Sequence, residues 1–142
     1  MTEVIMALSE RDKVNMIEQE MLKHEQVMCP LMHYFSPGVY AREISIPKGT
    51  LLTGAIHKYA QLNILSKGDI SVLTEKGIVR VQAPFTVVSP PGTKRIAYAH
   101  EDCIWTTILH TNETDPEKIE AAFTAKSEAE YLEFCEEMKC LL

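Results

Sequence analysis

The stretch GTLLTGAIHKYAQLNILSKG, from Gly49 to Gly68, decides the fold of this 142-residue chain. It begins and ends with glycine, contains runs typical of β-strands, and holds a single histidine, His57. Glycine at such positions indicates turns, because it adopts backbone angles that other residues avoid. Histidine is also a common metal ligand, so the first question is whether further ligands accompany His57.

The sequence around this stretch, from Val39 to His110, consists of short apolar runs separated by turn signals. The eight runs are VYAREISI, TLLTGAIH, QLNIL, ISVLT, IVRVQ, FTVVS, RIAYA and CIWTTILH. Short strands at nearly regular spacing indicate an antiparallel barrel or sandwich. The clearest hairpin is LTEKGIVRV, in which Gly77 supplies the positive φ of the turn.

A helical pattern precedes the β region. Val14, Ile17 and Met21 fall at helical spacing, and Ser9 before them is a suitable N-cap, so we expect a helix over residues 10–25. The segment CPLMHYFSPG, rich in proline and glycine, then ends this pattern.

Two short helices are predicted after the β region, within residues 115–139. Asp115 before Pro116 is an N-cap followed by a first-turn proline, and Ser127 with Glu130 fits a capping box. We therefore expect one domain over residues 1–142, mainly β, with a barrel over 39–110 between an N-terminal helix and two C-terminal helices.

Composition and charge exclude several classes of protein. The chain is 46% hydrophobic and 24% charged, an ordinary profile for a soluble protein. Its net charge is −6, and the charge is unevenly distributed, with a mildly basic middle segment between two acidic flanks. This distribution argues against general nucleic-acid binding. No apolar run is long enough to span a membrane, the N-terminus lacks the pattern of a cleaved signal, and the four cysteines form no dense framework. We expect a cytoplasmic protein.

The stretch 49–68, together with PPGTKRIAYA at 90–99, resembles the two motifs of the cupin superfamily. Gly49, His57 and Gly68 stand where the first motif requires them, and Pro90 and Gly92 match the second. The resemblance implies a single antiparallel cupin-type β-barrel, a double-stranded β-helix or jelly roll. The overall style of the chain is also similar to small proteins encoded by tailed bacteriophages, which would place it in the host cytoplasm.

The same resemblance implies a metal site of three histidines and a glutamate, and the sequence departs from it at three of the four positions. Ala55, Gln61 and Arg95 replace two histidines and the glutamate, and only His57 is retained. A catalytic metal normally has at least three protein ligands, and Arg95 is a cation. We therefore expect no metal and no other cofactor. His24, Cys29 and His33 also lie near one another in sequence, but their spacing matches no standard zinc motif.

Strand alternation places the polar residues of these motifs on the inner wall of the barrel. We expect His57, Gln61, Asn63 and Arg95 to face inward beside small residues, with Lys58 and Lys94 adding charge at the rim. Arginine presents a planar fork suited to carboxylate or phosphate. The alternative is a filled barrel, in which these side chains satisfy one another and Glu43 or Asp102 pairs with the arginine.

Three functions follow from these alternatives. The leading hypothesis is metal-independent binding of a small anion, phosphate-bearing or nucleotide-like, by a phage protein that sequesters or degrades a host signalling nucleotide. The second is a metal-independent isomerase, lyase or phosphodiester-cleaving enzyme, with His57 as acid or base and Tyr59 or Tyr98 as its partner. The third is a structural scaffold. In each case we expect a homodimer or higher homo-oligomer, with the N-terminal helix and Trp105 as candidate interface elements.

Overall fold

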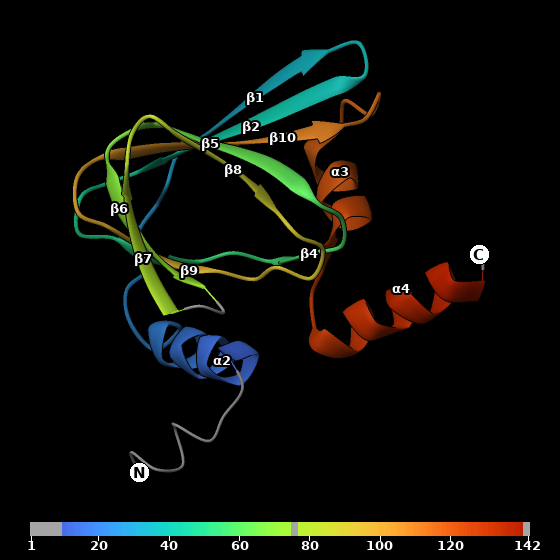
Figure 1. The fold of residues 1–142 in the computed structure, drawn as a ribbon, viewed down its shortest axis with the longest axis horizontal. Coiled ribbons are helices and arrows are strands. Elements are labelled where there is room, and N and C mark those ends of the chain that lie inside the picture. The colour runs from blue at the N-terminus through green and yellow to red at the C-terminus, as the bar shows by residue number, and fades with distance from the viewer. Residues whose placement is uncertain (1–9, 75–76, 141–142) are drawn as a thin grey trace.

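Two antiparallel sheets face one another in the computed structural model, which describes residues 10–74 and 77–140 (Figure 1). The elements in chain order are α2 (Glu10–Met21), β1 (Leu31–Ser36), β2 (Val39–Ile46), β3 (Leu51–Thr53), β4 (Ile56–His57), β5 (Gln61–Lys67), β6 (Asp69–Thr74), β7 (Gly77–Gln82), β8 (Phe85–Ser89), β9 (Ile96–Ala99), β10 (Cys103–His110), α3 (Pro116–Phe123), β11 (Thr124–Ala125) and α4 (Glu128–Cys140). The predicted mainly β fold with N- and C-terminal helices is confirmed.

The sheets have five and four strands and enclose the core. The larger has the order β1-β2-β10-β5-β8, and the smaller has the order β3-β9-β6-β7. A separate two-strand ladder joins β11 to β4. Apolar side chains from both sheets meet between them, and the buried cluster consists of Ile46, Leu65, Ile70, Val72, Ala99 and Cys103.

Two hairpins show how local sequence sets the register. β6 and β7 are paired up to Thr74 opposite Gly77, and Gly77 has the expected positive φ of 97°. Strand β1 lies in the segment that we interpreted as a break in the pattern. Pro37 and Gly38 instead form a two-residue turn, with Gly38 at φ 77°, and this turn returns the chain into β2.

Some predicted boundaries differ from the structure. The N-terminal helix ends at Met21 and not at residue 25, and residues 22–24 form a turn and a bend. The run TLLTGAIH is interrupted at Gly54 and Ala55, so it forms β3 and β4 in place of one strand. These two residues leave the sheet where the backbone N–H of Gly54 donates to Arg95 O at 3.1 Å.

The two C-terminal helices begin at the predicted caps. Glu117 N donates to Asp115 Oδ1 at 3.0 Å, and Glu130 N donates to Ser127 Oγ at 3.1 Å. Between the helices lies β11, in which Thr124 pairs with His57 of β4. Helix α4 has no buried residue, so its predicted apolar face is only half-covered.

Helix α2 lies against the four-stranded sheet (Figure 1). Glu18 of α2 accepts hydrogen bonds from Thr53 Oγ1 at 2.8 Å and from Lys94 Nζ at 2.9 Å. Val14, on the same helix, is buried. Within the described ranges, no helix is long and apolar enough to cross a membrane.

Candidate ligand-binding cavity

A cavity of about 450 Å³ lies between the two sheets, and helix α3 forms part of its wall. Its apolar wall includes Leu31, Ile44, Leu52, Ala97 and Trp105. Its polar wall includes His33, Tyr40, Arg42, His57, Gln61, Asn63, Arg95 and Thr107. This volume is within the range of ordinary small-molecule sites, which are mostly apolar with a few convergent polar groups.

Two arginines from opposite sheets line this cavity without a carboxylate partner in the described part of the chain. Arg42 comes from β2, and Arg95 immediately precedes β9. The Arg95 guanidinium lies over the ring of Trp105, with 5.8 Å from Cζ to the ring centroid. Burial lowers the pKa of Arg95, although an arginine remains charged at neutral pH. Arg80, by contrast, pairs with Asp69 at 2.8 Å outside the cavity.

His57 is a neutral hydrogen-bond donor in this cavity. Burial, with smaller effects of Arg95 and Arg42, lowers the pKa of His57 to about 4, so the ring is uncharged at pH 7. The Gln61 amide nitrogen is hydrogen-bonded to Nδ1 of His57. An amide nitrogen only donates, so Nδ1 accepts and Nε2 carries the proton. The imidazole can therefore donate to a ligand oxygen.

Asn63 belongs to a separate buried network. Its amide donates to Ser89 Oγ at 2.6 Å and accepts from Thr107 Oγ1 at 2.9 Å. Asn63 and Ser89 are each 1% exposed. The predicted inward polar residues thus differ: the Asn63 side chain is satisfied by the protein, whereas the Arg95 guanidinium has no hydrogen-bonding partner among the described residues.

The sequence analysis missed a second pair of cavity residues, Tyr40 and His33. Tyr40 Oη lies 2.6 Å from His33 Nδ1, and burial raises the pKa of Tyr40. Strand alternation in VYAREISI was the signal that could have found Tyr40 and Arg42, because Ile44 and Ile46 on the same face identify it as inward. His33 lies in β1, which was not predicted.

The part of the wall that comes from α3 is acidic. Glu117 and Glu120 both line the cavity, and the charge of Glu120 contributes to the raised pKa of Tyr40. The predicted arginine partners Glu43 and Asp102 do not pair with Arg95. Asp102 instead accepts a hydrogen bond from Lys48 N at 2.8 Å, and Glu43 lies on the opposite face of β2 from Arg42.

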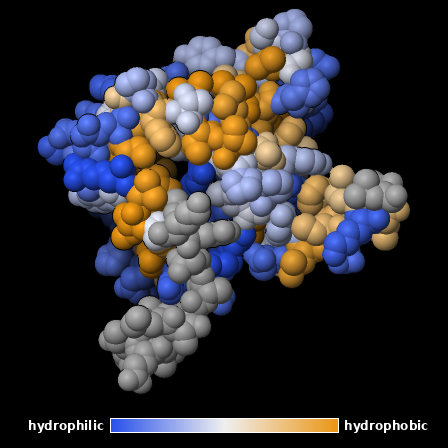
Figure 2. Space-filling model, in the orientation of Figure 1, coloured by the Kyte–Doolittle hydropathy of each residue, from blue (hydrophilic) through white to orange (hydrophobic). Residues whose placement is uncertain are grey.

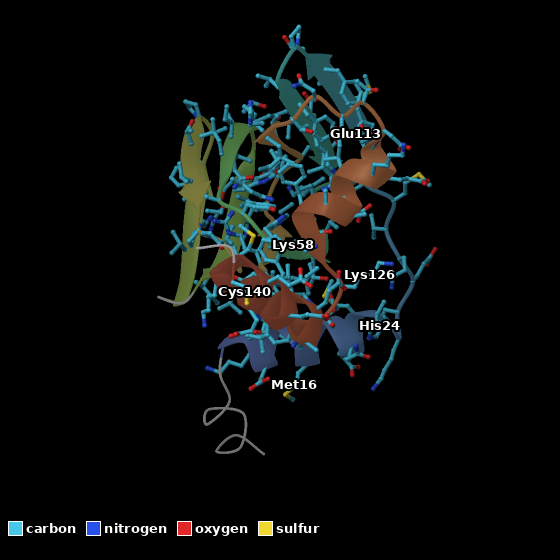
Figure 3. The ribbon with its side chains drawn as sticks, turned by 90° about the vertical axis from the view of Figure 1, so that its right-hand side faces the viewer. Met16, His24, Lys58, Glu113, Lys126 and Cys140 are labelled. Atoms are coloured by element: carbon cyan, nitrogen blue, oxygen red, sulfur yellow. The ribbon has the colours of Figure 1, made fainter. Side chains whose placement is uncertain are left out.

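Four predicted site residues do not line the cavity: Lys58 and Lys94, which were expected at its rim, and Tyr59 and Tyr98, which were the candidate partners of His57. Lys58 sits over the ring of Phe134, between α3 and α4 (Figure 3). Tyr59 packs edge-on against the same phenylalanine. Lys94 binds Glu18 of α2, and Tyr98 packs against His100 on the outer face of β9. In each case strand alternation or a helix contact turns the side chain away from the barrel interior.

No family model matches the sequence, and a search of curated proteins finds no match. Solved structures match by shape. A cupin superfamily protein from Desulfitobacterium hafniense DCB-2 has a TM-score of 0.51 at 10% identity, with 63% of this chain and 83% of that chain covered. A putative ethanolamine utilization protein Q from Salmonella typhimurium LT2 also has a TM-score of 0.51 at 10% identity, over 61% of this chain and 72% of that one. This chain has a cupin fold. At this level of identity the likeness concerns the fold alone, and the similarity to phage proteins stays a prediction.

The residues at the metal positions of the cupin fold do not fit a metal ion. Ala55, His57, Gln61 and Arg95 all line the same cavity, as the sequence motifs imply. Ala55 has no donor atom, Nδ1 of His57 is engaged by Gln61, and Arg95 is a cation. Nowhere in residues 10–74 and 77–140 do three or more His, Cys, Asp or Glu side chains converge. Of the three residues considered for zinc in the sequence, His24, Cys29 and His33, the last is hydrogen-bonded through Nδ1 to Tyr40.

Proposed function

We propose that the cupin cavity binds a small organic anion with a carboxylate or phosphate group, without a metal ion. The observation that carries this proposal is the pair Arg42 and Arg95, which reach the cavity from opposite sheets and have no carboxylate partner in the described residues. Arg95 is partly buried, and a partly buried charge without a counter-ion is unfavourable, so an anionic ligand would neutralise it. Arg42 is more exposed and adds a second positive charge at the same cavity.

Each polar residue has a role in this proposal. Arg95 offers two parallel N–H donors to one anionic group, and the Trp105 ring holds the guanidinium in place. Nε2–H of His57 adds a neutral donor, while Gln61 fixes the orientation of the imidazole. The carboxylates of Glu117 and Glu120 would repel an anion from the part of the wall that α3 forms, so the charged group of the ligand is expected beside the guanidinium groups and away from these carboxylates.

A nucleotide is the finer form of this proposal. Its phosphate would meet the arginines, and its base would lie against the apolar wall that contains Ile44 and Leu52. Sequestration or degradation of a host signalling nucleotide by a phage-encoded protein would use this chemistry. That role is motivated by the sequence resemblance, and the cavity supports only its anion-binding part.

An enzymatic function is the second candidate, favoured by the Tyr40–His33 contact at 2.6 Å. Both side chains line the cavity, and His33 lies opposite Arg42 in the register of β1 and β2. A hydroxyl and an imidazole in hydrogen-bond contact can relay a proton to a bound ligand. In this form of the proposal they replace Tyr59 and Tyr98 as acid/base candidates beside His57.

A thermal-shift screen tests both candidates. The panel contains inorganic phosphate, small carboxylates, nucleoside monophosphates and the matching uncharged nucleosides. A ligand at a hundred times its dissociation constant stabilises the folded state by about 2.7 kcal/mol. We expect anions to raise the melting temperature and their uncharged analogues to leave it unchanged. Chromatography of the incubated ligand then separates binding from turnover.

Lysine substitutions make this screen specific. Arg95→Lys and Arg42→Lys keep the charge but lose the planar fork, so each should weaken the stabilising anion. Arg80→Lys is the matched control, because Arg80 pairs with Asp69 outside the cavity. Equal shifts for all three variants, or no anion-dependent shift in the wild type, would contradict the proposal.

A further inference from the structure

The charged side chains of the cavity form two groups of opposite sign. Arg42 and Arg95 come from the two sheets, whereas Glu117 and Glu120 come from helix α3. Figure 1 shows α3 between the strands β10 and β4. No other Asp, Glu, Lys or Arg side chain of the described residues lines this cavity. The charges of its wall therefore sum to zero when the histidines are neutral.

These opposite charges lie near one another but do not pair. Burial raises the pKa of Tyr40, and two charges act on the same hydroxyl in opposite directions: Arg42 lowers its pKa and Glu120 raises it. Both charges are thus within electrostatic range of one buried group. Neither of them forms an ion pair with another described residue. Opposite charges that share a cavity without touching are complementary to a ligand that carries both signs.

A second hollow, of about 720 Å³, meets the cavity at α3. Four glutamates line this hollow. Glu18 binds Lys94 at 2.9 Å, and Glu130 Oε2 accepts a hydrogen bond from Lys126 N at 3.1 Å. The other two are the glutamates of α3, which line both spaces and whose carboxylates have no partner in the described part of the chain. The free carboxylates therefore lie where the cavity and the hollow join.

Glu120 occupies a position where a carboxylate is unfavourable for the helix itself. It lies in the last turn of the eight-residue helix α3, where the helix dipole is negative, and this turn contains no basic residue. Glu117 lies in the first turn, where a negative charge stabilises a helix. Helix stability thus accounts for Glu117 but not for Glu120, and the cavity is the other feature to which Glu120 belongs.

We propose that the ligand of this cavity is zwitterionic, with a carboxylate or phosphate beside Arg42 and Arg95 and a protonated amine beside Glu117 and Glu120. This inference rests on the proposed anion site and specifies the class of its ligand. A protonated amine has three N–H donors, so one amine can serve both carboxylates. An anion without the amine would leave them unpaired and would be repelled by them, which makes the α3 carboxylates a basis for specificity.

The segment that joins the two charged ends is expected to be a hydrocarbon chain. Apolar residues, among them Ile44, Leu52 and Ala97, form much of the remaining wall. In the view of Figure 2, hydrophobic surface gathers over the part of the molecule where β2, β5 and β10 lie, and strongly hydrophilic surface appears below it, between the two sheets. Apolar walls with a few polar groups at fixed places are typical of small-molecule sites.

The test compares ligands that differ only by an amine. The parent anions are butyrate, pentanoate and propyl phosphate, each paired with the derivative that carries an amine at the far end of its chain. Butylamine tests the amine alone. The carboxylate and phosphate pairs distinguish the two kinds of anionic group, and the two carboxylate lengths report the spacing between the charged ends. NMR titration of the isotope-labelled full chain at neutral pH measures dissociation constants into the millimolar range, which suits ligands of this size.

We expect the amine to lower the dissociation constant by about 10-fold or more for at least one chain length, as one charge-assisted hydrogen bond would do. Glu120→Gln removes the charge and keeps the shape, so the two members of each pair should bind about equally, and the parent anion should bind no more weakly than before. Glu120→Asp should retain part of the preference. Glu133→Gln is the matched control, because Glu133 is an exposed residue of α4 that lines neither space, and it should keep the full preference.

The possible failures can be told apart. Parent anions that bind as tightly as their amine derivatives would leave the anion site standing and overturn this inference. If neither the anions nor their derivatives bind, the anion site itself is refuted, and the inference with it. A preference for the amine that both Glu117→Gln and Glu120→Gln leave intact would also overturn it, because the amine would then be recognised by other groups.

Discussion

The Arg95 guanidinium lies over the indole ring of Trp105, with 5.8 Å between Cζ and the ring centroid, and both side chains line the cavity. Trp105 is the only tryptophan in the chain. Its fluorescence therefore reports on a single place in the molecule, beside the residue to which we assign the anion. This arrangement provides a direct optical test of the proposed site.

The first prediction is that binding of an anion changes the emission of Trp105. A ligand that engages Arg95 neutralises or moves the cation over the ring, so the intensity or wavelength of emission should change and saturate with ligand. Fluorescence titration with the anions found by thermal shift measures this. Arg95→Lys should weaken the binding by roughly 10-fold or more, as expected when a bidentate contact is lost. A stabilising anion that leaves the emission unchanged would place the site elsewhere.

The second prediction concerns the pH dependence of stability. The pKa of His57 is about 4 in the folded chain against an ordinary value of 6.5. Below pH 6.5 His57 is protonated in the unfolded chain but stays neutral in the folded chain, so the free energy of unfolding falls as the pH is lowered to 4. This difference between the two pKa values corresponds to a loss of about 3 kcal/mol of stability. Urea unfolding at a series of pH values measures the loss.

His57→Asn is the variant that isolates this effect, because an amide oxygen can still accept the hydrogen bond from Gln61 without titrating. The decline between pH 6.5 and 4 should be much smaller in this variant. The hydrogen bonds of Arg80 and Gln82 lower the pKa of Asp69 to about 2, so the stability that Asp69 contributes is lost below pH 3.8. The two windows are therefore separate. An unchanged slope in His57→Asn would show that His57 is not the group responsible.

The fold followed from the sequence because its determinants are local. Gly49, Gly68 and Gly92 all have the positive φ that the motif positions imply, and Gly77 closes the predicted hairpin. Strand β1 was missed because Pro37 and Gly38 were interpreted as an end, although a two-residue turn of this kind also joins paired strands. A proline-glycine pair that ends a segment and one that forms a hairpin turn look alike in the sequence, and only the pairing of β1 with β2 shows that this one forms a turn.

The cavity was only partly predictable, because alternation gives the face of a side chain but not its partners. His57, Gln61, Asn63 and Arg95 do face inward. Nothing in the sequence indicated that Asn63 bonds to Ser89 and Thr107, which lie 26 and 44 residues away. The pairing of Lys94 with α2 likewise depends on how a distant helix packs.

The third prediction separates the buried network from the ligand site. Asn63→Ala leaves Ser89 and Thr107 without their side-chain partner, which should cost about 1–3 kcal/mol of unfolding free energy for each hydroxyl. Asn112→Ala is the control, because its Oδ1 accepts a solvent-exposed hydrogen bond from Gly38 N, and the substitution should cost less than about 1 kcal/mol. Denaturant unfolding measures both. Similar losses for the two variants would contradict the assigned role of Asn63.

The last prediction compares the two glycines that bound the stretch deciding the fold. Both have positive φ, 82° at Gly49 and 103° at Gly68, so alanine at either position strains the backbone by about 1–2 kcal/mol.

The surroundings of the two glycines differ. A Cβ at Gly49 would meet no atom within 4 Å, whereas a Cβ at Gly68 would lie 2.5 Å from both Asp102 O and Cys103 Sγ. Cys103 is a buried member of the core cluster, so its side chain cannot move without disturbing the packing of the core. Gly68→Ala should therefore lower the unfolding free energy by about 3 kcal/mol or more, and Gly49→Ala by the strain alone. Thermal and denaturant melts of the two variants measure the difference, and equal losses would mean that the close approach at Gly68 does not restrict the chain.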